Sequence, residues 1–455
     1  MKKHPFLFCT AVTALCYLSA SLMFYTQIDL IAQQFDPLVS FAATGWVDLF
    51  QGVGMLLLLF LSRRDAALFT SRFFHAGILA ATLPVILLTV LFPSRAMLTV
   101  MLPVLQVLLG ASTALYFALT AAHAGRGRRT LCFALAYALG SLGTWLLSEI
   151  DSSFLTSRLV LIPDLLLIVL CIVLILSGPD AAGADTASPR APLGPFLREN
   201  ALLLLTIVLM TAVSTIGSPD NLLFSTGVKI SSVAARAPYG IGLIAAALLY
   251  ERSAGAGAVC TLASLIYPFL ATILLRAGIV PELLCMLSYV FLGFFAVYRA
   301  GTFFDLTAAG ALPPVTAVIG LAFSRLAEAA AVLLPGDLSQ VSPLVSFVIA
   351  GVLFIPLLIV FFTLFARSAA SPAAPTPAPS EAERRAAFAE RYGLTRREEE
   401  VAFYLSQSKS NGEIAALLNL SENTVRFHVS NVLKKTGLHD RNEVSHAFHA
   451  SPGQK

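Results

Sequence analysis

The strongest constraint on this chain is a series of apolar runs, each close to 20 residues long, that recur as far as Phe365. A helix of about 20 residues crosses the roughly 30 Å hydrocarbon layer of a bilayer, because each residue advances it by about 1.5 Å. Charged residues make up only 12% of the chain and apolar residues 57%, whereas soluble domains are about a quarter charged. The runs therefore predict an all-α, polytopic membrane protein.

The apolar runs predict about twelve spans. Their limits are 6–27, 40–61, 73–92, 97–122, 130–149, 154–177, 199–217, 232–250, 256–275, 280–303, 309–334 and 343–365. Residues 178–195, rich in Pro, Gly and Ala, separate the sixth span from the seventh. We therefore expect residues 1–367 to form a transmembrane, sensor-like domain of two six-helix halves joined by this linker.

A repeated spacing supports the two halves. Gly54, in Gly52-Val53-Gly54, stands ten residues before Arg64 at the end of the second span. Gly242, in Gly240-Ile241-Gly242, stands ten residues before Arg252 at the end of the eighth span. In span number, central linker and this repeated pair, residues 1–367 resemble the major facilitator superfamily of transporters. The basic-acidic loop signature of that family is reduced here to Ser62-Arg63-Arg64-Asp65, which counts against transport.

The basic residues of the loops predict the orientation. With the N-terminus in the cytoplasm, thirteen Lys or Arg residues fall on the inner face and five, Arg236 among them, on the outer face. An even number of spans then places the C-terminus in the cytoplasm as well. We expect a multi-pass protein of the inner (cytoplasmic) membrane, in which the signal-like N-terminal run is an uncleaved first helix.

Ionisable residues inside the spans are candidates for a ligand or ion site, because lipid penalises a charge without a partner. Arg325 and Glu328 lie three residues apart in the eleventh span and can pair on one helix face. A structural ion pair and a ligand or ion site both fit this pair. Asp48 in the second span is a further candidate, for which a structural role is favoured. Arg299 and Asp305 are interpreted as side chains that snorkel to a cytoplasmic helix end.

The six cysteines lie in apolar runs and form no Cys-x-x-Cys pair. We expect buried thiols rather than disulfides or a metal site. The sequence also contains no recognisable nucleotide-binding loop, metal-ligand cluster or nucleophile–base pair. We therefore predict neither an enzyme nor a cofactor.

The composition changes after Arg367. Residues 368–390 are predicted to be a Pro/Ala-rich linker, in which four prolines between 372 and 379 favour extended polyproline II. Residues 381–455 hold eleven Lys or Arg and ten Asp or Glu residues, more than a third of the charge of the chain. A small soluble domain is therefore expected at 391–455.

Helix-start signals divide this C-terminal block into four short helices. The signals are the capping boxes Thr395-x-x-Glu398 and Ser410-x-x-Glu413, a cap at Ser421 for a helix ended by Gly437, and Asp440-x-x-Glu443. The second and third helices are joined by the turn Asn419-Leu420-Ser421, and the third helix is basic. Two short helices joined in this way predict a helix-turn-helix.

The same residues resemble the LuxR/GerE-type DNA-binding domain. The pattern is carried by Leu394, Thr395, Arg397, Glu398, Asn411, Glu413, Ile414, Ala415, Ser421, Thr424, Val425, Arg426, His428, Asn431, Val432, Leu433, Lys435, Gly437 and Arg441. Ser408 stands where the family usually has glycine. Gly412 stands where it usually has lysine, which would remove a phosphate contact. The resemblance implies a regulator that binds double-stranded DNA as a homodimer, with Val444 and Phe448 of the fourth helix as dimerisation candidates.

The helix after Ser421 has two contrasting sides. Val425, Val429, Val432 and Thr436 cluster on one side, which must pack inward. The opposite side is polar apart from Phe427, whose alternative role is packing on a partner helix. His428 is expected to be a packed interior residue, and the acidic run 398–400 is expected to face away from DNA. The resemblance places Arg426, Phe427 and Ser430 near base edges, and Thr424, Asn431 and Lys434 at the DNA backbone.

Two functions fit this combination. The first is a membrane-integrated DNA-binding transcriptional regulator, whose membrane domain senses an unknown small molecule or another membrane signal. The second is a secondary transporter of the major facilitator type with an appended, autoregulatory DNA-binding domain. In that case Arg325 and Glu328 would be the coupling pair.

Overall fold

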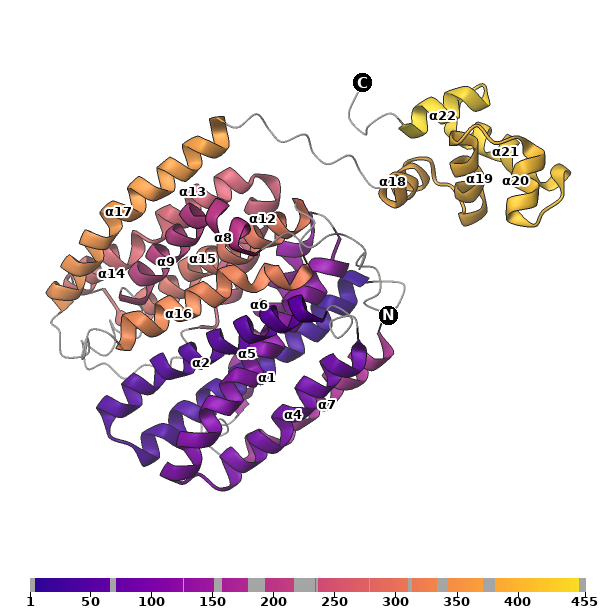
Figure 1. Cartoon of the computed structure of the whole chain (residues 1–455). Coiled ribbons are helices and arrows are strands. Elements are labelled where there is room, and N and C mark those ends of the chain that lie inside the picture. The colour runs from indigo at the N-terminus through magenta and orange to yellow at the C-terminus, as the bar shows by residue number, and fades with distance from the viewer. Residues whose placement is uncertain are drawn as a thin grey trace. The chain divides into compact units, whose positions relative to one another are not determined.

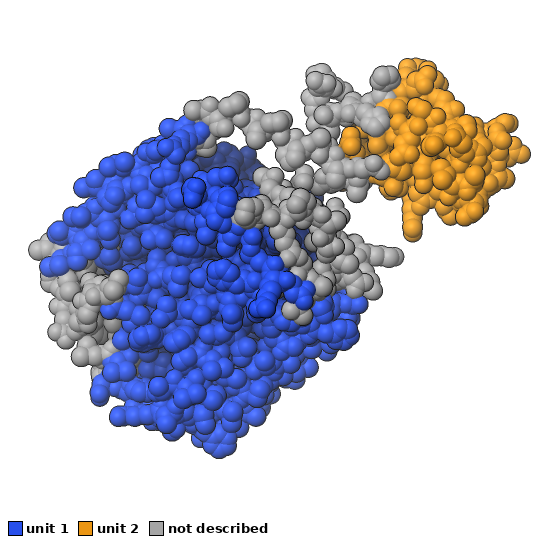
Figure 2. Space-filling view, in the orientation of Figure 1, with its two compact units in different colours: residues 1–368 blue, residues 369–455 orange. Residues whose placement is uncertain are grey.

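The computed structural model describes residues 5–65, 71–125, 127–150, 158–178, 193–216, 234, 236–277, 279–309, 313–333, 343–370 and 381–449. Within these ranges the chain is helical and contains no strand, as predicted. It divides into two compact units, Met1–Ser368 and Ala369–Lys455, which Figure 2 shows in different colours. Below, Met1–Ser368 is called the membrane unit and Ala369–Lys455 is called the reader.

The membrane unit contains the long helices (Figure 1). Its N-terminal part consists of α1 (Pro5–Gln34), α2 (Pro37–Arg64), α4 (Arg72–Leu91), α5 (Arg95–His123), α6 (Arg129–Ile150), the short 3-10 helix η2 (Arg158–Val160) and α7 (Leu161–Ser177). Its C-terminal part consists of α8 (Leu193–Glu199), α9 (Ala201–Ile216), α12 (Tyr239–Arg252), α13 (Ala254–Ser264), α14 (Tyr267–Arg276), α15 (Pro281–Ala309), η3 (Pro314–Val318), α16 (Ile319–Leu333) and α17 (Pro343–Ala370).

Ten helices of the described ranges are long and apolar enough to cross a membrane. The pair α8–α9, bent by 67°, raises this number to eleven if it forms one span. The chain is therefore a multi-pass membrane protein. Within the described ranges this is one or two fewer than the about twelve spans expected, and the difference lies at the eighth expected span, 232–250, where the described helix α12 has 14 residues. At about 1.5 Å per residue, it is too short to cross the hydrocarbon layer alone. Most of the residues directly before it, 217–233, lie outside the described part.

Glycines bring two pairs of helices into close contact at equivalent places. A Cβ atom on Gly54 of α2 would overlap the backbone carbonyl of Val107 in α5. A Cβ atom on Gly242 of α12 would overlap the backbone carbonyl of Val290 in α15. Small residues at such crossings allow the backbones to approach, which is a common way to pack helices in lipid. The glycine repeat of the sequence thus corresponds to two similar crossings, one in each part of the unit.

The two parts meet through α2 against α16 and through α12 against α6. Gly52 of α2 lies close to Leu326 of α16, and Gly240 of α12 lies close to Ala138 of α6. The α2–α16 contact positions the charged residues described in the next section.

The reader has five helices, α18 (Glu381–Tyr392), α19 (Arg396–Ser406), α20 (Asn411–Leu418), α21 (Glu422–Thr436) and α22 (Arg441–His449). The four helices predicted after Thr395 are present. Residues 381–390, placed by the prediction in the linker, instead form most of α18, whose Phe388 is buried in the core of the reader. This core consists of Phe388, Val401, Ala402, Phe403, Leu405, Ile414, Ala415, Val425, Val432, Val444 and Phe448.

Candidate DNA interface and membrane cavity

Capping residues hold α20 and α21 in a helix-turn-helix. The Ser410 backbone N–H donates to Glu413 Oε2 at 2.8 Å, and Ser410 Oγ accepts from the Glu413 N–H at 3.3 Å. Asn419 ends α20 in the left-handed region with φ 53°. Ser421 Oγ then accepts from the Thr424 N–H at 3.1 Å. These local bonds satisfy backbone donors at the helix starts and set the turn between the two helices.

Helix α21 presents the two sides expected from its sequence. Val425 and Val432 are fully buried, and Val429 packs against the same core. On the outer side, Phe427 is 63% exposed, and Ser430 and Lys434 are exposed beside it. The outer side of α21 is therefore polar apart from one exposed ring, as the sequence predicts.

The remaining predicted DNA-binding residues are paired with a neighbouring side chain or half-buried. Arg426 is exposed, but its Nη2 lies 2.9 Å from Oε1 of Glu422 one turn earlier. Thr424 is half-buried, and its hydroxyl lies 2.7 Å from Ser421 Oγ in the helix cap. Asn431 is also half-buried. The structure therefore brings all six residues onto one helix, with Arg426, Phe427, Ser430 and Lys434 open to solvent.

The acidic run at the start of α19 is neutralised within the reader. Glu398 is 5% exposed, and its Oε2 accepts from Lys435 Nζ at 2.6 Å and from the Thr395 N–H at 2.7 Å. Burial alone would raise the pKa of Glu398, but the bonds from Lys435 and Thr395 lower this pKa below its ordinary value. Glu399 and Glu400 are paired as well, with Arg385 at 3.3 Å and Arg397 at 2.8 Å.

The fourth predicted helix does not offer the expected apolar surface for a second copy. Val444 is fully buried and Phe448 is 4% exposed, because α22 packs on α19 and α18. The Phe448 ring lies 5.3 Å from that of Phe388 and 6.2 Å from that of Phe403. The assignment of Val444 and Phe448 to dimerisation was wrong: both belong to the core of the reader. His428 is half-buried rather than fully interior.

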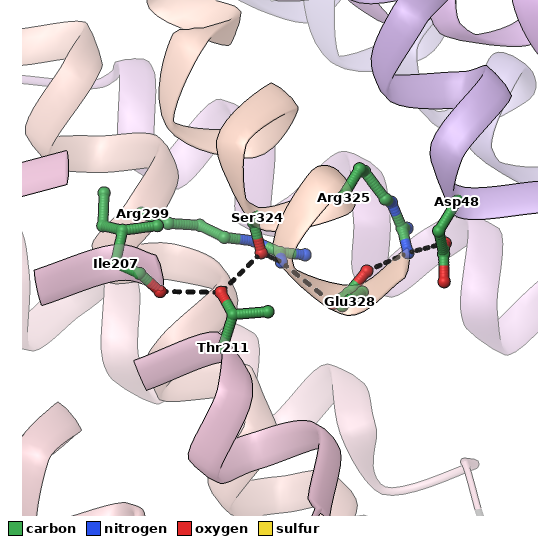
Figure 3. A network of polar contacts seen from close by, with 7 residues as sticks. All are labelled: Asp48, Ile207, Thr211, Arg299, Ser324, Arg325 and Glu328. Carbon is green, nitrogen blue, oxygen red and sulfur yellow. Dashed lines mark hydrogen bonds and ion pairs between the residues drawn. The ribbon is translucent and has the colours of Figure 1, made fainter. Parts of the chain in front are cut away.

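In the membrane unit, the three predicted ionisable residues form one cluster (Figure 3). Arg325 Nη1 in α16 lies 2.6 Å from Glu328 Oε2 and 2.8 Å from Asp48 Oδ1 in α2. One guanidinium nitrogen therefore bonds both carboxylates, across the contact between the N-terminal and C-terminal parts of the unit.

Arg299 belongs to the same cluster, so the expectation that it snorkels at a helix end was wrong. It is 8% exposed. Its Nη1 donates to Ser324 Oγ at 2.6 Å and lies 3.6 Å from Glu328 Oε1, and the Ser324 hydroxyl continues to Thr211 at 3.0 Å (Figure 3). Asp305 remains exposed and accepts a bond of 3.0 Å from the Tyr250 hydroxyl.

The charged cluster lines a cavity of about 250 Å³ between the two parts of the membrane unit. Ten aromatic residues, Phe295 among them, also line it, as does Arg236. The sequence patterns singled out none of these aromatic residues and placed Arg236 in an outer loop. The signal that could have found them is the clustering of Tyr17, Tyr116, Tyr137, Tyr239 and Tyr289 in otherwise apolar spans.

All six cysteines lie in the described ranges, and none forms a disulfide. Four of them are buried, and Cys16 and Cys260 are half-buried. In the same ranges, no group of three or more His, Cys, Asp and Glu residues is arranged to hold a metal ion.

Residues 393–448 match the family of bacterial regulatory proteins called the luxR family. The spore germination protein GerE of Bacillus subtilis (strain 168) is 48% identical over 50 residues, which are 11% of this chain and 68% of GerE. The chain belongs to the luxR family. This LuxR-type chain is also 50% identical over 54 residues to the uncharacterized transcriptional regulatory protein YhcZ of the same bacterium, covering 12% of this chain and 25% of YhcZ.

The transcriptional activator protein AhyR of Aeromonas hydrophila is 46% identical over 48 residues, 10% of this LuxR-family chain and 18% of AhyR. The chain thus spans a quarter or less of YhcZ and AhyR. The family assignment therefore describes the LuxR-type reader, and says nothing of the membrane unit.

Solved structures show the fold of the membrane unit. The nucleoside transporter NupG superposes with a TM-score of 0.56 at 12% identity, over 78% of this chain and 99% of NupG. The human organic anion transporter MFSD10 superposes with a TM-score of 0.58 at 15% identity, over 79% and 99%. At these identities the likeness carries the fold alone, and it confirms the predicted fold of the major facilitator type. The LuxR-type chain therefore joins a DNA-binding regulator domain to a transporter-like membrane unit.

Proposed function

We propose that the protein is a membrane-integrated transcriptional regulator, whose membrane unit senses a small molecule or another membrane signal and controls the reader. The observation that carries the proposal is the exposed outer side of α21, with Phe427 at its centre, in a LuxR-type reader on a multi-pass chain. A sensing role also agrees with a closed charge network across the α2–α16 contact, because a ligand that rearranges this network would change how the two parts pack.

In this proposal α21 enters the major groove. Arg426, Phe427 and Ser430 contact base edges, with the Phe427 ring on a thymine methyl group and Arg426 on guanine or a phosphate. Thr424, Asn431 and Lys434 contact the sugar–phosphate backbone and set the register. Arg426 must leave Glu422 to do so, because this ion pair holds its guanidinium along the helix.

The first experiment measures DNA binding by the fragment 381–455 and by the full chain in nanodiscs, on the promoter region of its own gene. We expect salt-sensitive, sequence-selective binding, because phosphate contacts release counterions. The double change Arg426→Ala/Phe427→Ala should abolish selectivity. Arg396→Ala is the matched control, since this arginine is 92% exposed on α19. Equal binding by the double variant and the wild type would refute the assigned DNA contacts.

Transcript profiling of the double variant against the wild type would identify the regulated genes.

The proposal includes a location and an assembly. The protein would lie in the cytoplasmic membrane with both termini in the cytoplasm, where DNA is accessible, and would bind its operator as a homodimer. Reporter fusions after Lys455 and before Met1 test the topology. Crosslinking of the reader with and without operator DNA tests the dimer.

A transporter with an autoregulatory reader is the second candidate, favoured by the fold of the membrane unit and by its charged cavity. Arg325 and Glu328 would then couple substrate movement to an ion. Solute uptake in proteoliposomes that is lost in Arg325→Gln/Glu328→Gln would support transport. Promoter control without any flux would favour the first candidate.

A further inference from the structure

A row of four tyrosine rings lines the membrane cavity. The rings of Tyr17 and Tyr137, in the N-terminal part of the unit, are stacked with their centroids 4.2 Å apart. Tyr137 lies 5.1 Å from Tyr239 of the C-terminal part, and Tyr239 lies 6.2 Å from Tyr289. This tyrosine row therefore crosses from one part to the other, and it offers ring faces and edges to a flat aromatic group.

Four charged residues of the cavity are already paired with one another. Arg325 bonds Asp48 and Glu328, and Arg299 lies 3.6 Å from Glu328, with its guanidinium carbon 5.2 Å from the centre of the Phe295 ring. The two arginines thus balance the two carboxylates. Breaking a partly buried ion pair leaves a charge without its partner, which is costly. A ligand with a net charge therefore gains little here, because it would have to compete with these pairs.

Arg236 is the fifth charged residue among the described lining residues. Its guanidinium carbon lies 5.4 Å from the ring centres of Phe24 and Tyr25 and 5.2 Å from that of Tyr289. Such cation–π contacts stabilise a cation in a desolvated site, and Arg236 has further interactions in the protein as well. Arg236 is therefore part of the wall of the cavity and gives no reason to expect a charged ligand.

Three uncharged polar side chains of the lining remain available to a ligand. They are the half-buried side chains of Ser21 on α1, Gln51 on α2 and Ser141 on α6. None of the three forms a hydrogen bond to another residue of the described ranges. The Gln51 amide and the two hydroxyl groups can each donate and accept, and polar groups inside a protein are normally paired. These side chains therefore favour a ligand that both donates and accepts hydrogen bonds.

We propose that the cavity binds a small uncharged molecule that combines a flat aromatic ring with a hydrogen-bonding group, such as an aromatic amide. Its ring would lie against the tyrosine row, and its amide group would bond Gln51. A cavity of about 250 Å³ holds a ligand of one or two rings, because pockets for drug-sized molecules start at about 300 Å³. The inference rests on the proposed sensing function for its biological role, since it names the ligand class of that cavity.

A ligand in this position contacts both parts of the membrane unit. The tyrosine row crosses between them from Tyr137 to Tyr239, and the ion pair of Asp48 with Arg325 crosses between them as well. A ligand shifts a conformational equilibrium only if it binds one arrangement better than another. Because its ring contacts both parts, the ligand stabilises the arrangement in which Tyr137 and Tyr239 lie side by side.

The test uses the full chain in nanodiscs and four matched probes, with binding followed by calorimetry against empty nanodiscs. The probes are 2-naphthamide, the anion 2-naphthoate, the cation 2-naphthylmethylammonium, and decahydro-2-naphthamide as the uncharged non-aromatic compound. We expect 2-naphthamide to bind at least about tenfold more tightly than each of the others, because only it is both uncharged and aromatic. Equal or tighter binding of any of the other three, or no binding of 2-naphthamide, would overturn the proposal.

Variants of the lining separate the two parts of the ligand. Gln51→Leu should weaken 2-naphthamide binding by about tenfold, because it removes the hydrogen bonds to the amide. Gln33→Leu is the matched control, since Gln33 is exposed on α1 and does not line the cavity. Tyr137→Leu should weaken 2-naphthamide but not its saturated analogue, and Tyr137→Phe, which keeps the ring, should retain the difference between the two. Unchanged affinity in both Gln51→Leu and Tyr137→Leu would contradict the proposal; if Tyr137→Leu fails to fold, Gln51→Leu decides.

Promoter binding by the full chain, with and without 2-naphthamide, separates the two proposals. If the amide binds but promoter occupancy does not respond, the ligand class stands and the sensing role fails. If the chain controls its promoter but does not bind the amide, the regulator stands and the ligand class fails.

Discussion

At the scale of the residue, the backbone angle at Ser408 explains why the family usually has glycine at this position. The LuxR pattern usually has glycine at this position, and Ser408 adopts φ 59° at the turn after α19. A left-handed conformation costs a residue with a Cβ atom roughly 1–2 kcal/mol, whereas glycine adopts it freely. The serine is therefore tolerated, but it strains the reader.

We expect Ser408→Gly to stabilise the reader by about 1 kcal/mol, because relief of the strain exceeds the added entropy of the unfolded chain. Urea unfolding of the fragment 381–455 measures this change. Gly437→Ser is the matched opposite: Gly437 has φ 69° and open space around a Cβ atom, so only backbone strain is added. Destabilisation by Ser408→Gly would contradict the argument.

At the scale of the element, a few side chains decide which helices pack together. Lys435 near the end of α21 reaches Glu398 at the start of α19 and the carbonyl of Gly393, with bonds of 2.6 and 3.2 Å. This contact ties the C-terminal end of α21 to the start of α19, and it also removes an acidic residue from the reader surface. In the membrane unit, the glycine crossings have the same role between α2 and α5 and between α12 and α15.

The Glu398 contact predicts the acid stability of the reader. Because the pKa of folded Glu398 lies below its unfolded value of 4.5, its contribution is fully present above this pH and is lost as the pH falls through the folded pKa. Glu398→Gln should cost about 2 kcal/mol at pH 7 and flatten the loss of stability below pH 4.5. Urea unfolding between pH 3 and 7 measures both. An unchanged slope in the variant would show that other carboxylates dominate.

The α2–α5 crossing predicts sensitivity to a single methyl group. Gly54→Ala places a Cβ atom against the Val107 carbonyl, so the helices must separate, at a cost of about 2 kcal/mol. We expect a lower melting temperature for the full chain in detergent. Gly77→Ala in α4 is the control, because nothing described lies within 4 Å of its Cβ position. Equal melting temperatures for both variants would mean that α2 and α5 are not held at this distance.

At the scale of the whole molecule, each unit has its own hydrophobic core. The core of the reader lies entirely within residues 388–448, and the membrane unit has two clusters of its own. A core that is closed within one unit allows that unit to fold independently.

We therefore expect the fragment 381–455 to unfold in one cooperative transition with a midpoint independent of the membrane unit. Circular dichroism and urea titration of the fragment measure this transition. A second fragment that starts at Gly393 keeps the Thr395 cap but lacks α18 and with it Phe388, which is 6% exposed. It should be less stable by about 3 kcal/mol or more. Equal stability of the two fragments would show that α18 is not part of the reader.

Local patterns were enough to predict the helical membrane class, the four capped helices after Thr395 and the two sides of α21. Each depends on neighbours within a few residues: run length, the Ser410-x-x-Glu413 box, and the spacing of Val425, Val429 and Val432. The pairing of Arg325 with Glu328 was predictable for the same reason. Other features depend on residues far apart in the chain.

Tertiary structure alone placed Asp48, 277 positions from Arg325, on the same guanidinium. It also drew Arg299 into this cluster and turned Val444 and Phe448 inward. Hydropathy measures how apolar a segment is, but it does not show which face of a helix packs against which neighbouring helix. The sequence therefore determined most of the helices and the LuxR type of the reader, and only the packing of α2 on α16 and of α22 on α19 decided which side chains share a site.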